Sequence, residues 1–432
     1  MKRVHIRSSL FIITGLAFQS CHNNKNLVEK SFIDSLQTLY TPDSLLASNE
    51  RILHFWQDRI SPTNPGNINE LQYAGTLINR FKLAGHIQDL DSANAILKKV
   101  DTTFAHTLAA PLMSLVSLSI MRHRFAEGDI FYKKACTIGI KAYQKNAIGF
   151  DIAFELGYYG QAGNLLKNMS GLKDYNYYFR RSKFDHLNGK MDSTLSAMQQ
   201  AIVLAGKSPY LQNLAWSMMG DLEVHQNNLS AASTDLKEAI RLNPGDIHSI
   251  LQLGWVTLVQ NNDTVDAKAL FEIAKKRNEL PDPYYKSYQM AQWQKDNQKA
   301  FFYARLFEQK STMYQYGSMY SKYLIELYTT ILNQPQKAEN LAFAELKNRA
   351  TPQTYTWFAY SLLCNHQKEK AYKIFQQYIA GKPIEGIELY YVGKILKSVG
   401  HGLDAEKCFD AAMENKYDLS PYMINDIKKM EE

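Results

Sequence analysis

Residues 213–246 read NLAWSMMGDLEVHQNNLSAASTDLKEAIRLNPGD, and this stretch decides the fold. Small residues occur at Gly220 in its first half and at Ala232 in its second half. A small side chain lets two helix backbones approach closely, and Leu236, four positions after Ala232, lies on the same helix face. Pro244 follows, where a helix cannot continue. The stretch therefore predicts two antiparallel helices, the second of which ends near Pro244.

The pairing of a small residue with a large apolar one four positions later recurs along the chain. Successive pairs are 33 to 38 residues apart, a regularity that is hard to obtain by chance. A single helical hairpin cannot bury its own apolar face, so a period of this length predicts stacked neighbours. The pairs are Ala93/Leu97, Gly128/Tyr132, Ala162/Leu166, Ala197/Ala201, Ala232/Leu236, Ala267/Phe271, Ala300/Ala304, Ala338/Ala342, Ala371/Phe375 and Ala405/Phe409.

The unit resembles the tetratricopeptide repeat (TPR), whose pattern is W-x2-L-G-x2-Y…A-x3-F…P. The matching residues are Trp216, Gly220, Ala232, Leu236 and Pro244, with departures at Met219 and Glu223. The resemblance implies an all-α fold, an α-solenoid of stacked antiparallel helical hairpins in a right-handed superhelix. We expect clearer repeats over 213–420, degenerate ones over 68–212 and a C-terminal capping helix over 421–432. Residues 21–67 are expected to be a flexible tether with one helix at about 44–59.

The N-terminal sequence predicts where in the cell the protein is located. A positively charged start precedes an apolar core at 10–18, which is too short to span a bilayer and has the proportions of a secretory signal. Cys21 then resembles the lipidated cysteine of bacterial lipoproteins of the Bacteroidetes type, with departures from the common pattern at Phe18 and Gln19. The resemblance implies a signal peptide over 1–20, lipidation of Cys21 and a position in the cell envelope. The outer membrane, facing the periplasm, is the expected location.

Composition excludes several classes of function. The formal charge of +7 falls to +4 once the three basic residues of the signal are removed, which is too weak over this length to indicate a nucleic-acid partner. Only 12 prolines and 22 glycines punctuate the chain, which favours long helices. The remaining cysteines are Cys136, Cys364 and Cys408, whose odd number and wide spacing predict free, buried thiols, not disulfides or a zinc site.

No motif predicts catalysis, a metal or a cofactor. The zinc-protease motif His-Glu-x-x-His and the nucleophile motif Gly-x-Ser-x-Gly do not occur in the sequence. His366 lies close to Cys364, but a solvent-facing or capping role at a helix end is commoner than metal binding. An enzyme with its site in the weakly repetitive N-terminal part is the least favoured alternative, because nothing organises Glu70, Asp89 and Asp91 into a site.

In TPR proteins the residue after the small position of the first helix often points into the concave groove. Carried over to this chain, that position is occupied by Asp221, Trp255, Tyr360 and Lys394, which we expect to contact a partner. The resemblance thus implies a membrane-anchored, non-enzymatic scaffold that binds a protein or peptide of the cell envelope. The alternative is a glycan-binding helical-repeat lipoprotein. That function needs long loops carrying aromatic residues, for which the repeat spacing leaves little room.

Overall fold

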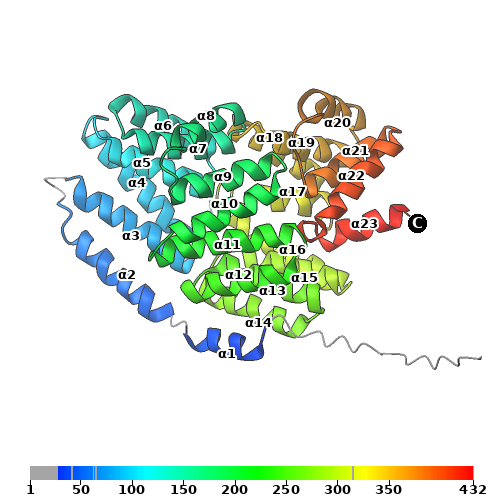
Figure 1. The fold of residues 1–432 in the computed structure, drawn as a ribbon, viewed down its shortest axis with the longest axis horizontal. Helices are drawn as coiled ribbons and strands as arrows, with labels where there is room; N and C mark the ends of the chain where they lie inside the picture. The colour runs from blue at the N-terminus through cyan, green and yellow to red at the C-terminus, as the bar shows by residue number, and fades with distance from the viewer. Residues whose placement is uncertain (1–27, 40–41, 62, 64–65, 314–315, 432) are drawn as a thin grey trace, which may run out of the picture.

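The computed structural model describes residues 28–39, 42–61, 63, 66–313 and 316–431, and Cys21 with the signal segment lies outside them. The described chain is built of helices joined by short turns (Figure 1). The helices follow one another as hairpins: α3 (Ile68–Ala84) with α4 (Ile87–Thr103), α5 (Ala109–Met121) with α6 (Phe125–Ile138), α7 (Ala142–Glu155) with α8 (Tyr159–Met169), α9 (Tyr175–Leu187) with α10 (Met191–Leu204), α11 (Pro209–His225) with α12 (Leu229–Leu242), α13 (Ile247–Asn261) with α14 (Thr264–Arg277), α15 (Asp282–Trp293) with α16 (Asn297–Met313), α17 (Ser321–Thr329) with α18 (Pro335–Asn348), α19 (Pro352–Cys364) with α20 (Lys368–Ile374), and α21 (Ile387–Ser398) with α22 (Gly402–Glu414).

The periodic signature of the sequence marks the second helix of each hairpin. Each small residue of the series lies on an even-numbered helix from α4 to α22 and is buried; Ala232 on α12 and Ala405 on α22, for example, are 0% and 1% exposed. The prediction of an all-α solenoid of stacked antiparallel hairpins is confirmed.

Glycine on a first helix meets the large residue of the second helix. A Cβ atom added to Gly220 would lie 2.6 Å from Cγ of Leu236, and one added to Gly254 would lie 2.5 Å from Cε1 of Phe271. Both distances are far shorter than carbon–carbon contact, so the two helices of these hairpins pack at a separation that only glycine permits. The close approach is the physical reason for the recurring pattern.

The N-terminal segment contains two helices where the sequence predicted one. These are α1 (Lys30–Leu39) and α2 (Pro42–Gln57). Pro42 begins α2, since proline is well suited to the first turn of a helix and cannot continue a preceding one. Ile33 and Leu36 of α1 are 3% exposed each and pack in one core cluster with residues of α12 to α14. The segment therefore covers the base of the solenoid.

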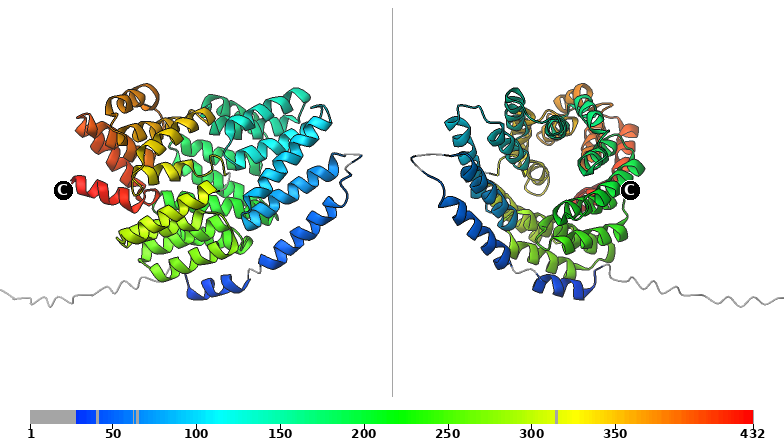
Figure 2. Two further views of the ribbon diagram at one scale, coloured as in Figure 1. Left: turned by 180° about the vertical axis from the view of Figure 1, so that it is seen from behind. Right: turned by 60° about the vertical axis from the view of Figure 1, so that its left-hand side comes forward.

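The solenoid curls so that its second half packs along its first half (Figures 1 and 2). One continuous core cluster includes residues of α3 to α7 and of α15 to α23. Asn348 at the end of α18 donates from Nδ2 to the carbonyl oxygen of His123 at 2.6 Å, and the amide of Glu279 donates to the carbonyl of Ala84 at 2.9 Å. Asn415 donates to the carbonyl of His225 at 2.7 Å. These contacts close the array into a ring-like body.

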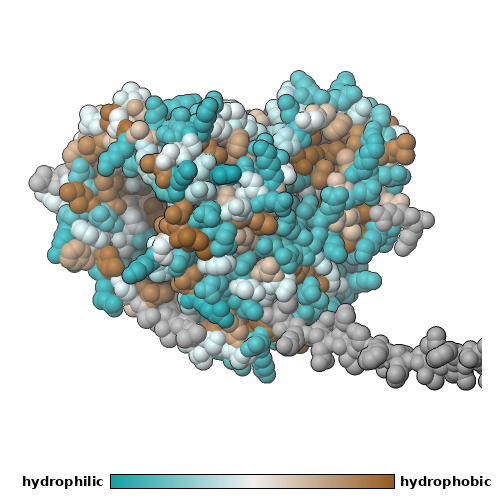
Figure 3. Space-filling model, in the orientation of Figure 1, coloured by the Kyte–Doolittle hydropathy of each residue, from teal (hydrophilic) through white to brown (hydrophobic). Residues whose placement is uncertain are grey.

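The chain ends in a short 3-10 helix, η2 (Lys416–Asp418), and in α23 (Pro421–Glu431). Met423 and Ile427 of α23 are 0% exposed, so this helix covers the last hairpin with an apolar face. Within the described part of the chain, no helix combines the length and apolar character needed to cross a bilayer. On the face shown in Figure 3, apolar side chains form patches separated by polar ones.

Candidate functional site

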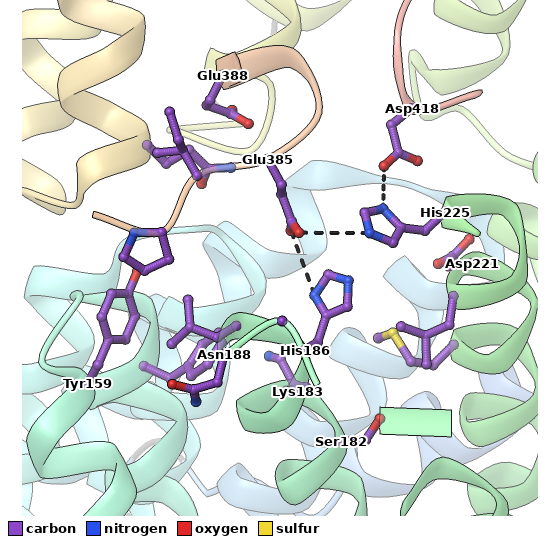
Figure 4. Close-up of a pocket in the computed structure, with 18 residues that line it drawn as sticks. Tyr159, Ser182, Lys183, His186, Asn188, Asp221, His225, Glu385, Glu388 and Asp418 are labelled. Atoms are coloured by element: carbon purple, nitrogen blue, oxygen red, sulfur yellow. Dashed lines mark hydrogen bonds and ion pairs between the residues drawn. The ribbon is translucent and has the colours of Figure 1, made fainter. Parts of the chain in front are cut away.

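A cavity of about 810 Å³ opens where hairpins of the first half of the array meet the last two hairpins. One wall comes from the repeats α7 to α11, with Tyr159, Lys183 and Asp221 among its side chains (Figure 4). The opposite wall comes from α19, α21, η2 and the connection 380–386, which precedes α21. The cavity exists only because the solenoid closes on itself.

The connection 380–386 is the least repeat-like element at this site. It follows η1 (Phe375–Ile379), a π-helical turn that ends the second helix of its hairpin. Gly381 and Gly386 have φ angles of 70° and 53°, in the left-handed region that glycine adopts without strain. π-helical turns occur frequently at functional sites, and the connection after this one contributes Glu385 to the cavity wall. Because Ala371 and Ala405 keep the regular repeat spacing, the sequence pattern did not reveal this connection.

Two histidines of the first wall and two carboxylates of the opposite wall meet where the two walls come into contact. His186 on α9 and His225 on α11 have ring centroids 4.7 Å apart. The distance from Nδ1 of His225 to Oδ2 of Asp418 is 2.5 Å. Glu385 lies 3.7 Å from Nδ1 of His186 and 3.9 Å from Nε2 of His225. The sequence analysis did not single out either histidine, because they lie in different repeats.

The two imidazoles have opposite electrostatic character. Burial and the neighbouring His225 lower the pKa of His186 to about 4, so this ring is neutral at pH 7. Burial also lowers the pKa of His225, but the hydrogen bond with Asp418 and the charges of Asp418 and Glu385 outweigh it and raise the pKa above its ordinary value. The neutral ring of His186 therefore lies beside the ring of His225, which is hydrogen-bonded to the carboxylate of Asp418.

A strip of polar side chains continues from the cavity along the first helices of successive hairpins. Asp221 on α11 accepts from Nε2 of Gln252 on α13 at 2.9 Å and lies 2.7 Å from Nε2 of His248. Lys286 on α15 donates to Oε1 of Gln252 at 2.8 Å. The strip reaches water, since the His248 side chain is 55% exposed.

Charges in this strip perturb one another. Burial raises the pKa of the Asp221 carboxyl, but the charge of His248 and hydrogen bonds from His248 and Gln252 outweigh it and hold the pKa below its ordinary value. In return, Asp221 raises the pKa of His248 to about 9. Burial lowers the pKa of Lys286 to about 8. The strip is thus a network of mixed charge whose members depend on each other's ionisation.

Of the residues that the TPR register placed in the groove, Asp221 lines the cavity, and Trp255 lines an adjoining pocket together with Gln252 and Lys286. Trp255 is 2% exposed and donates from Nε1 to the carbonyl of Tyr417 at 3.2 Å, because the C-terminal segment covers it. Tyr360 is 4% exposed and stacks on Tyr391 with centroids 4.0 Å apart. Lys394 forms a 2.8 Å ion pair with Asp426 of α23. Tyr360 and Lys394 are therefore engaged in packing within the last repeats.

The carboxylates considered for an N-terminal enzyme site each have a structural contact. Asp89 forms an ion pair with Arg80 at 2.6 Å, and Asp91 forms one with Arg122 at 2.6 Å. Glu70 accepts a hydrogen bond from the amide of Gly66 at 3.1 Å. The three groups do not share a cavity among those found in the described residues. The contacts of these three carboxylates join neighbouring elements of the fold.

The cysteines of the solenoid are less deeply buried than expected. Cys136, Cys364 and Cys408 are free thiols, and each is half-buried. Burial raises the pKa of the Cys364 thiol to about 11 and also raises that of Cys408. His366, in the turn after α19, is exposed and has a φ of 61°, as a residue in a tight turn does.

No family model matches this chain, and no curated protein matches it. Several solved structures are remotely similar to it. Human IFIT1 dimer with PPP-AAAA is 12% identical, with 76% of each chain covered and a TM-score of 0.44. Yeast Tom70 is 12% identical, with 89% of this chain and 84% of that one covered and a TM-score of 0.36. Pseudomonas aeruginosa pilF is 12% identical, with 50% of this chain and 97% of that one covered and a TM-score of 0.35. At such values the fold assignment rests on the helices and contacts of this chain.

Proposed function

We propose that this protein is a binding scaffold whose interior holds an extended segment of a partner protein or a peptide. The observation that carries the proposal is the polar strip, to which the first helices of consecutive hairpins contribute Asp221, Gln252 and Lys286. An extended peptide presents an unpaired N–H or C=O at every residue, and each needs a partner when it leaves water. A row of amide, carboxylate and ammonium groups meets that need.

The adjoining cavity supports the same proposal. Its volume of about 810 Å³ lies within the range of sites that bury most of a ligand. Phe154, Tyr159 and Leu222 supply apolar surface among the charged groups of its walls. Apolar contact area with a few placed polar groups is the usual composition of a specific binding site. Aromatic anchors of the partner would lie here.

The partner is best identified by crosslinking from inside the ring. We would place a photoreactive phenylalanine at Asn188, an exposed residue of the cavity lining, and in a second variant at Glu406, an exposed residue on the outer helix α22. One protein crosslinked from Asn188 but not from Glu406, and competed by a soluble peptide of its sequence, is the expected result.

Equal crosslinking from both positions, or none from Asn188, would refute binding in the interior. Carbohydrate crosslinked at Asn188 would favour the glycan-binding alternative instead. Because both substitutions lie at exposed positions, neither disturbs the core, so loss of crosslinking cannot be attributed to unfolding.

The proposal also places the scaffold on a membrane, attached through a lipid on Cys21 and facing the periplasm from the outer membrane. Its support is the sequence of residues 1–21 alone. Cells fed an alkyne fatty acid should label the wild-type protein and a Cys136→Ser variant, and should not label Cys21→Ser. Label that persists in Cys21→Ser would refute the anchor. Protease added to intact cells should leave the solenoid uncut if it faces the periplasm.

A further inference from the structure

His186, His225 and Glu385 converge from three separate elements of the ring. One donor atom of each lies within 4.8 Å of the donor atoms of the other two. Figure 4 shows both imidazoles and the carboxylate directed toward one another at the cavity wall. We propose that these three side chains bind a divalent transition-metal ion, with zinc as the preferred ion.

The distances suit a metal better than direct bonding between the side chains. Glu385 is 3.7 Å from His186 Nδ1 and 3.9 Å from His225 Nε2, and both separations exceed hydrogen-bond length. In a tetrahedral zinc site with bonds of about 2.0–2.1 Å, neighbouring ligand atoms lie roughly 3.4 Å apart. The three donor atoms lie within 4.8 Å of one another, so side-chain rotations that move them closer by up to about 1.4 Å bring them to zinc-binding separation.

Asp418 prepares His225 as a ligand. The 2.5 Å contact between Oδ2 of Asp418 and Nδ1 of His225 assigns the ring proton to Nδ1, which leaves the lone pair of Nε2 facing Glu385. Metal-binding histidines almost always carry such a partner on the other ring nitrogen, since it fixes the tautomer and strengthens the ligand. A Cβ atom added to the neighbouring Gly386 would be in ordinary contact with Asp418, 3.5 Å from its Cβ, so the φ angle of 53° is what favours glycine there.

The donor set selects the class of metal. Two imidazole nitrogens and one carboxylate oxygen suit zinc and its transition-metal neighbours, whereas calcium and magnesium require oxygen ligands. Three protein ligands leave the fourth tetrahedral position to water or to a group of a bound molecule, because the site lies in the cavity wall. Glu385 is 52% exposed, so an ion can enter from the cavity side.

Metal binding would join the middle repeats of the array to its last repeats. His186 and His225 belong to α9 and α11, while Glu385 and Asp418 belong to the connection 380–386 and to η2 of the last repeats. An ion bound by residues of both walls stabilises the folded array, because any ligand that binds only the native state shifts the folding equilibrium toward that state. The site is independent of a peptide partner, so it stands or fails apart from the scaffold proposal.

The test is metal uptake by the full-length protein. After chelator treatment and dialysis, we expect it to bind about one Zn²⁺ per chain and to give the visible absorption of tetrahedral Co²⁺ when cobalt is supplied. His186→Ala, His225→Ala and Glu385→Gln should each weaken Zn²⁺ binding about tenfold or more, and Asp418→Asn about 10–100-fold. His366→Asn, which changes an exposed histidine in a distant turn, should bind as the wild type does.

Thermal melting separates loss of the site from loss of the fold. Zn²⁺ should raise the melting temperature of the wild type and of His366→Asn, but not that of Glu385→Gln, although all three have the same helical circular dichroism without metal. The proposal is overturned if the wild type takes up neither Zn²⁺ nor Co²⁺. It is equally overturned if the folded Glu385→Gln and His225→Ala variants bind Zn²⁺ with the affinity of the wild type.

Discussion

The close packing of the hairpins makes the substitution Gly254→Ala a severe test of the fold. Gly254 lies in the middle of α13, and a Cβ atom there would be 2.5 Å from Cε1 of Phe271 and 3.3 Å from Cβ of Leu270. Phe271 is 2% exposed and Leu270 is 0% exposed, so neither side chain can move into solvent. The added methyl group must therefore push the two helices apart.

Two opposing effects set the magnitude. Alanine is a better helix former than glycine by about 1 kcal/mol in a helix interior. Overpacking a core costs about 1–3 kcal/mol, and a contact this short against a buried ring belongs in the upper part of that range, about 2–3 kcal/mol. Gly254→Ala should therefore lower the free energy of unfolding by about 1–2 kcal/mol, despite the gain in helix propensity.

Gly75 provides the matched control. It lies inside α3 with no atom within 4 Å of an added Cβ, so Gly75→Ala should instead raise the stability by about 0.5–1 kcal/mol. Hydrogen exchange of the local helices measures both changes, because a repeat array need not unfold in one step. Gly254→Ala combined with Phe271→Leu should recover part of the loss. Equal or greater protection of α13 in Gly254→Ala would refute the reasoning from close packing.

Four further outcomes follow from the ring and its polar strip. Removing the hydrogen bonds of Asn348 across the ring closure by Asn348→Ala should cost about 1–2 kcal/mol and speed exchange in α6, whereas Asn340→Ala, an exposed change on the same helix, should leave exchange unaltered. Asp221→Asn should bring the pKa of His248 down from about 9 toward its ordinary value, read from the histidine NMR titration; an unchanged value would disprove the pairing. Because the pKa of His248 is raised and that of Asp221 is lowered, the pair stabilises the fold between those two pKa values, and the contribution fades as the pH rises through about 9. Burial lowers the pKa of Lys286 to about 8, so its amine should react faster with a small amine-reactive reagent as the pH rises through about 8. Competitive labelling resolved by mass spectrometry measures this change.

The sequence by itself determined the helices, their pairing and their spacing. These features depend on contacts between residues close in the chain, such as Gly220 with Leu236 within one hairpin. Small side chains allow close approach, side chains four apart share a face, and proline ends a helix, so the pattern can be read without coordinates. Asp221 was named through the TPR resemblance, which assigns the residue after Gly220 to the concave groove.

Ring closure was decided by the tertiary structure alone. The rotation between one hairpin and the next is small, and only its sum over all repeats determines which distant elements meet. That sum brought Asn348 to the first repeats and covered Trp255 with the C-terminal segment. The same sum set His186 and His225 beside Glu385 on a connection that the repeat period had concealed. Local periodicity specifies each hairpin, whereas the candidate site is a property of the curvature of the whole array.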